Sequence, residues 1–136
     1  MGWLASLRRL SPAERRTLIL AWALLALAPL LLRVLPLRRL LTVSPCRRRP
    51  ALAPERVAWL VTVAGRRVPG TRCLPMAMVT AWLLAWQGTP ATLRIGVARH
   101  ADRLSAHAWL ECAGRPLIDT IDDGYTPIVG VPVPAR

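Results

Sequence analysis

Three side chains that together suit a cysteine nucleophile occur in order along the second half of the chain. They are the thiol of Cys73, the imidazole of His107 and the carboxylate of Asp119. Catalysis by a cysteine needs an attacking sulfur, a base that handles its proton and an acid that orients the base. The sequence therefore predicts a Cys-His-Asp triad, a chemistry that calls for no cofactor.

Cys73 is predicted to open a helix over residues 73–87, because Pro75 is tolerated only in the first turn of a helix. Unpaired N–H groups and the helix dipole at such a start stabilise a thiolate and can form part of an oxyanion hole. The segment is apolar on nearly every side, with Thr80 as its polar interruption, which indicates a buried central helix. A lone cysteine is more commonly a small buried side chain, but the neighbouring Arg72 favours the reactive interpretation.

His107 lies in a predicted strand over residues 105–112, where side chains alternate between two faces. One face carries His107, Trp109 and Glu111, and the other carries Ala108, Leu110 and Cys112. The second set is small and apolar, so we expect it to face the core. Cys112 is then a structural thiol, and His107 lies on the opposite face beside Trp109.

Asp119 is assigned by the hairpin that follows. Residues 116–119 are predicted to form a short strand after a tight turn at 113–115, and a register centred on Ala113 sets Asp119 opposite His107. Cross-strand neighbours lie about 5 Å apart at Cβ, so this carboxylate could accept a hydrogen bond from the imidazole. Asp122 and Asp123 are alternative carboxylates farther along the chain.

The other elements predict an α+β fold with a small antiparallel sheet. A helix begins at Pro54 and stops at Gly65, and period-two alternation predicts a strand over residues 91–98. We expect residues 99–103 to form a polar loop that leaves His100 in solvent. The proline-rich tail over residues 121–136 is expected to be an irregular extended cover.

Residues 1–50 are predicted to be an N-terminal helical segment, apolar and flanked by arginines, ahead of an enzyme core over residues 51–136. Ser11 with Glu14 forms a capping signature. The apolar run over residues 18–32 is interrupted by a proline and falls short of the roughly 20 residues that a membrane span needs. Packing on the domain or on a partner, peripheral contact with a membrane surface, and a true span all stay open.

The bulk composition narrows the class of protein. Every one of the 19 basic residues is an arginine, and the formal net charge is +12. No nucleic-acid-binding signature accompanies the charge, so nucleic acid is not an expected partner. The cysteines are odd in number and sparse, which fits a reducing, cytoplasmic setting. With two histidines and no CxxC pair, a zinc site is not expected, and Cys46 is interpreted as an exposed loop thiol without a base.

The segments around the three candidate residues resemble a known family. They are VPGTRCLP at 68–75, LRIGV at 93–97, AHAWLE at 106–111 and GRPLID at 114–119. This pattern resembles the leader peptidase of lasso-peptide biosynthesis, the C-terminal half of the split lasso B protein, within the papain-like and transglutaminase-like cysteine enzymes. The resemblance is close over residues 55–120, and residues 14–39 are similar in a less specific way.

The resemblance implies a fold, a reaction and partners. The fold would be a transglutaminase-like core, with the nucleophile at the start of a buried helix packed on the sheet and N-terminal helices before it. Cys73 would be the nucleophile, His107 the base and Asp119 the orienting acid in removal of the leader from a ribosomally made precursor peptide. A small leader-recognition protein would act in trans, beside an ATP-dependent, asparagine-synthetase-like cyclase. Another transglutaminase-like acyl transfer or hydrolysis, and a non-catalytic membrane-associated scaffold, are the alternatives.

Overall fold

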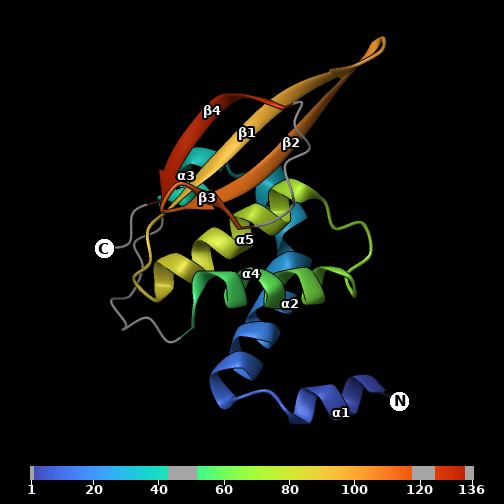
Figure 1. Cartoon of the computed structure of the whole chain (residues 1–136), viewed down its shortest axis with the longest axis vertical. Coiled ribbons are helices and arrows are strands. Elements are labelled where there is room, and N and C mark those ends of the chain that lie inside the picture. Colours follow the sequence, from blue (N-terminus) through green and yellow to red (C-terminus); the bar gives the residue numbers. More distant parts are fainter. Residues whose placement is uncertain (1, 43–51, 118–124, 134–136) are drawn as a thin grey trace.

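The computed structural model describes residues 2–42, 52–117 and 125–133. Within these residues, helices occupy the first two thirds of the chain and strands follow them (Figure 1). In chain order the elements are α1 (Gly2–Arg8), α2 (Pro12–Val34), α3 (Leu37–Leu41), α4 (Pro54–Gly65), α5 (Cys73–Trp86), β1 (Ala91–His100), β2 (Arg103–Cys112), β3 (Arg115–Pro116) and β4 (Thr126–Val133).

The strands form one antiparallel sheet in the order β3-β2-β1-β4. Helix α5 packs against β1 and β2, and α2 and α4 pack against the other side of α5 (Figure 1). The predicted α+β class, with N-terminal helices before a small antiparallel sheet, is confirmed. The arrangement holds α5 between two layers, which is the position that its uniformly apolar sequence requires.

Helix α2 begins as its sequence predicts and continues farther than expected. The Ser11 hydroxyl accepts a hydrogen bond from the Glu14 N–H at 3.2 Å, and the Glu14 carboxylate accepts one from the Ser11 N–H at 2.7 Å. Pro29 was expected to break the apolar run, but it lies inside the helix, which ends at Val34. The helix tolerates the lost backbone hydrogen bond because Leu25 and Ala28, just before the proline, are packed in the core.

Helix α4 is joined to α2 both by apolar packing and by charge. Its buried residues include Val57, Leu60, Val61 and Ala64, whose spacing is that of one helical face. Arg56 Nε donates to Glu14 Oε1 at 2.5 Å. The backbone N–H of Ser11 and then the Arg56 guanidinium lower the pKa of Glu14 from its ordinary value.

Helix α5 is the central helix of the domain. All residues from Ala77 to Ala85 are buried, including Thr80, whose hydroxyl donates to the Met76 carbonyl at 2.8 Å. The Trp82 indole donates to the Leu40 carbonyl at 2.7 Å and so fixes α3 against α5. The sequence prediction of a buried helix from Cys73 is confirmed.

The β1–β2 hairpin is longer than the sequence suggested. Residues 99–103 were expected to form a polar loop, but His100 pairs with Arg103 and the turn contains Ala101 and Asp102 alone. Ala101 adopts a positive φ of 53° there. The prediction failed because residues 99–103 are mostly charged or polar, and strands that project from a sheet into solvent are as polar as loops.

The expectation of an irregular tail was wrong for its described part. Residues Thr126–Val133 form β4, which pairs with β1. Proline cannot donate to a strand ladder, so Pro127 and Pro132 argued against a strand. Both are accommodated because β4 is an edge strand of the sheet. The register also shifts between Ile95 and Gly96, opposite the start of β4.

Candidate active site

Cys73 is the first residue of α5, and its side chain is partly buried. Arg72 is the helix N-cap and makes no side-chain capping hydrogen bond, and the first turn contains no acidic residue. Pro75 supplies no N–H, so the N–H groups of Cys73 and Leu74 are the donors that this helix start can offer. An uncapped, acid-free helix start beside a thiol suits the binding of an oxyanion.

The two faces of the sheet have different surroundings. Leu93 and Leu110 pair across β1 and β2, are fully buried, and belong to the same core as α5. Because side chains alternate along a strand, His107 and Trp109 belong to the opposite face. The predicted alternation in β2 is therefore confirmed, with His107 on the face that does not contribute Leu110 to the core.

The His107 imidazole lies among aromatic side chains. Its ring centroid is 6.2 Å from that of Trp109 with an interplanar angle of 20°, and 5.2 Å from that of Tyr125 with an angle of 42°. The Tyr125 and Ser105 hydroxyls lie 3.2 Å apart in a hydrogen bond. These contacts restrict the orientation of the imidazole.

Trp109 is itself held by a charged pair. Its indole N–H donates to Glu111 Oε1 at 3.1 Å, while Arg94 Nε donates to Glu111 Oε2 at 3.1 Å. The indole is only 2% exposed. It covers Gly96 so closely that an added Cβ would lie 2.8 Å from the ring and 2.9 Å from the Thr126 carbonyl oxygen. Glycine is therefore required at position 96, because the ring leaves no room for a Cβ. Arg94 and Glu111 fix the position of Trp109, on which the His107 ring stacks.

Asp119 lies outside the described residues, as do Asp122 and Asp123. The strand pairing that leads toward it differs by one residue from the predicted register. Cys112 pairs with Arg115, and the Leu117 N–H donates to the Leu110 carbonyl at 2.8 Å.

The register differs because the turn between β2 and β3 has two residues. Ala113 and Gly114 have φ values of 50° and 77°. A tight two-residue hairpin turn needs positive φ at both central positions. The predicted register, centred on Ala113 itself, was wrong by one position for this reason.

One other thiol, that of Cys112, lies within the described residues. Cys112 Sγ donates to the Pro90 carbonyl at 3.6 Å. Burial, and then the charge of Glu55, raise the pKa of this thiol, which keeps it protonated. Cys112, which was predicted to face the core, is only partly buried and lies outside the core cluster. Cys46 lies outside the described residues.

The structure thus places His107 beside Trp109 and Tyr125, on the face of β2 opposite to the one that packs on α5. Cys73 lies at the start of α5, on the other side of the sheet. Among the described residues, no hydrogen bond connects the Cys73 thiol with the His107 imidazole. Hydrogen bonds between catalytic groups are often long or unformed before substrate binds. Within the same residues, no group of three or more His, Cys, Asp or Glu side chains could hold a metal ion.

Two residues near His107 were missed by the sequence analysis. Tyr125 is the single tyrosine of the chain, and that rarity was the available signal. Gly96 interrupts an otherwise regular strand pattern, which is a known sign of close approach by another group.

Comparison with known proteins identifies a family. A family model described as the transglutaminase-like superfamily matches residues 7–130. The match begins in α1 and extends into β4, so it includes both Cys73 and His107. No curated protein and no solved structure gives a significant match to the chain.

Proposed function

The chain belongs to the transglutaminase-like superfamily, and on that premise we propose that it is a cysteine peptidase that removes the leader from a lasso precursor peptide. The observation that carries the proposal is the location of Cys73 at the uncapped start of a buried helix, within the region matched by the transglutaminase-like family model. The sequence segments around Cys73 and His107, which resemble the lasso leader peptidase, supply the substrate class.

The proposed reaction is acyl transfer through the thiol. The Cys73 sulfur attacks the carbonyl carbon of the scissile peptide bond, and its proton passes to His107. The N–H groups of Cys73 and Leu74 stabilise the oxyanion of the tetrahedral intermediate. His107 then protonates the leaving amine, the C–N bond breaks, and a thioester remains on Cys73. Water attacks the thioester, releases the leader as a carboxylate and restores the thiol.

Substrate choice is proposed to depend on a partner. The small leader-recognition protein would bind the leader and deliver the scissile bond to Cys73. The asparagine-synthetase-like cyclase would then use the new N-terminus in an ATP-dependent step. Asp119 is proposed as the acid that orients His107 on the resemblance of the segment at 114–119 alone, since the observed β2–β3 register does not support it.

The test is processing of a precursor peptide by the full chain together with the recognition protein, followed by mass spectrometry. Cys73→Ala should abolish cleavage while the precursor still binds, because it removes only the nucleophile. Cys112→Ala is the matched control and should retain cleavage. If Cys73→Ala still cleaves and Cys46→Ala does not, Cys73 is not the nucleophile.

The same assay separates the alternatives. Asp119→Asn, Asp122→Asn and Asp123→Asn, compared side by side, identify the orienting carboxylate by the largest loss of rate. Adding hydroxylamine as an acyl acceptor distinguishes hydrolysis from a preferred acyl transfer. A chain that promotes processing equally well with Cys73→Ala would be a scaffold and would exclude the proposed peptidase.

A further inference from the structure

Helix α2 has two apolar sides, and only one of them is used by the fold. Leu18, Ala21, Leu25 and Ala28 are buried against the rest of the domain. Their spacing of three to four residues is that of one helical face. The side that they occupy faces α4 and α5, which are the main neighbours of α2.

The opposite side of α2 exposes large apolar side chains. Ile19 is 64% exposed, Leu30 is 58% exposed and Val34 is 70% exposed, and Trp22 and Leu27 are also exposed. At about 100° per residue these positions lie along one side of the helix. We call this set the α2 strip. A contiguous strip of this kind, unlike a single exposed leucine, marks an interaction surface.

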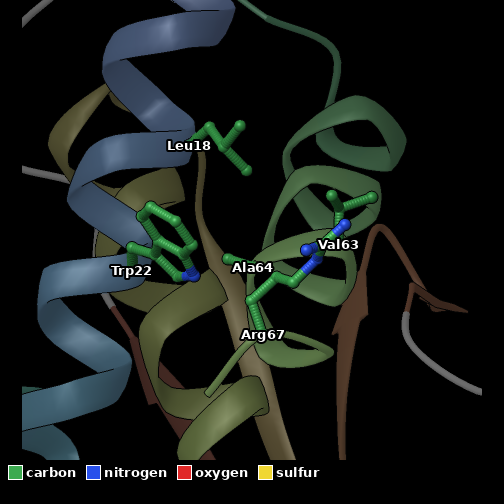
Figure 2. Close-up of a pocket in the computed structure, with 5 residues that line it drawn as sticks. All are labelled: Leu18, Trp22, Val63, Ala64 and Arg67. Carbon is green, nitrogen blue, oxygen red and sulfur yellow. The ribbon is translucent and has the colours of Figure 1, made fainter. Parts of the chain in front are cut away.

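A pocket borders the α2 strip at Trp22. Figure 2 shows Trp22 and Leu18 on α2 facing Val63 and Ala64 on α4, with Arg67 just beyond the end of α4. A neighbouring depression continues from Trp22 along α2 to Val68 and Pro69. The border of the strip therefore combines an indole with a guanidinium.

Positive charge flanks the α2 strip at both ends. Arg16 precedes Ile19 by three residues and Arg33 follows Leu30 by three, so both lie on the side of the strip. More arginines follow in α3 and precede α2 at the end of α1. The single acidic residue among residues 2–42 is Glu14, which is paired with Arg56. Residues 2–42 therefore offer no other negative charge to oppose an anionic partner.

We propose that the α2 strip binds the surface of an anionic phospholipid bilayer. The apolar side chains would enter the boundary between headgroups and acyl chains, and the flanking arginines would contact lipid phosphates. Trp22 is of the residue type that favours this boundary. The charge pattern favours an anionic bilayer as the partner. Apolar side chains with arginines at both ends match the acyl chains and the phosphate groups of the lipids.

A peripheral helix fits the packing better than a spanning one. Helix α2 is long and apolar enough to cross a membrane by length and composition. Its other side, however, contributes Leu25 and Ala28 to the core of the domain. A span would withdraw these residues from α4 and α5, whereas a helix lying in the surface keeps them in place. This inference does not depend on the proposed peptidase activity.

The experiment is flotation of the full chain with phosphatidylcholine vesicles, with and without phosphatidylglycerol. The chain should float with the anionic vesicles, bind neutral vesicles more weakly, and dissociate as salt is raised. Leu27→Glu with Leu30→Glu should reduce binding at least about tenfold, because carboxylates replace the side chains that enter the lipid. Arg16→Gln and Arg33→Gln should each weaken binding to anionic vesicles about fivefold.

Leu104→Glu with Ile128→Glu is the matched control, since both residues are exposed and lie on the sheet. This pair should float like the unmodified chain, and thermal melting should confirm that each variant folds. The proposal is overturned if the chain does not float, if the control pair loses binding equally, or if the bound chain resists carbonate extraction as a spanning protein does. It is also overturned if the strip variants leave flotation unchanged but abolish self-association or binding of the recognition protein.

Discussion

The two faces of the sheet are built from the same strands but meet different demands. One face carries Leu93 and Leu110 into the core against α5. The other face carries His107, Trp109 and Glu111. These side chains are held by hydrogen bonds, an ion pair and ring stacking, and not by packing against a helix. The first face is stabilised by burial of apolar area, and the second by specific geometry.

This difference separates stability from chemistry along a single strand. Burial is non-directional, so the Leu110 face tolerates changes that preserve apolar volume. The geometry around His107 depends on the orientation of Trp109. That orientation is fixed by the hydrogen bond to the Glu111 carboxylate and by the close contact of the ring with Gly96. Substitutions on the first face should alter stability, whereas those on the second should alter activity more than stability.

The largest effect is expected from Leu110→Ala on the helix-covered face. Leu110 is fully buried in the core, so the substitution should lower the free energy of unfolding by about 2–5 kcal/mol. Leu104→Ala, at an exposed position of the same strand with the same parity, should change it by less than about 0.5 kcal/mol. Urea denaturation measures both, and similar values for the two variants would contradict the burial of Leu110 in the core.

Gly96→Ala should come next, and it acts on the other face. Its Cβ would meet the Trp109 ring and the Thr126 carbonyl, so we expect a loss of about 1–3 kcal/mol of stability. Displacement of Trp109 would also move His107 and reduce leader removal by roughly 100-fold.

Gly2→Ala is the control for Gly96→Ala. The added Cβ would have no neighbouring atom within 4 Å, and Gly2 lies in α1, away from Trp109 and its partners. Activity and stability should therefore stay close to those of the unmodified chain. Equal losses in the two variants would show that Trp109 is not the cause.

Glu111→Gln should have a smaller effect on stability. It removes the ion pair with Arg94 but keeps an oxygen for the Trp109 indole, and the pair is partly exposed. We expect a loss of about 1 kcal/mol or less. The cleavage rate should fall roughly threefold. Asp102→Asn, which removes the same charge in the exposed β1–β2 turn, is the control and should leave the rate unaltered. A loss of stability without any loss of rate would contradict the role of Glu111 behind His107.

The smallest effect is expected from Ala113→Asn in the turn that sets the register of β2 and β3. Ala113 has a φ of 50°, which is costly for alanine and well tolerated by asparagine before glycine. Thermal melting should show a gain of about 0.5 kcal/mol. Ala106→Asn, at an exposed strand position, should show no gain, and a gain there would mean that the turn conformation is not the cause.

Much of the candidate site could be predicted because it depends on local signals. Pro75 and the uniform apolarity of the segment predicted that Cys73 opens a buried helix. Period-two alternation assigned His107 and Leu110 to opposite faces. Trp109 was predicted beside His107, but Tyr125 was not, because it comes from a segment outside the predicted hairpin.

The sequence by itself determined where helices begin and which side chains share a face. Capping groups, prolines and periodicity act over a few residues, so they can be read from the chain directly. The tertiary structure alone decided that β4 pairs with β1, that α2 continues past Pro29, and that the β2–β3 register differs by one residue from the predicted one. The first two depend on edge position and core packing, and such energies exist only when distant segments meet. The register depends on a two-residue turn with positive φ at Ala113, a conformation that alanine does not signal.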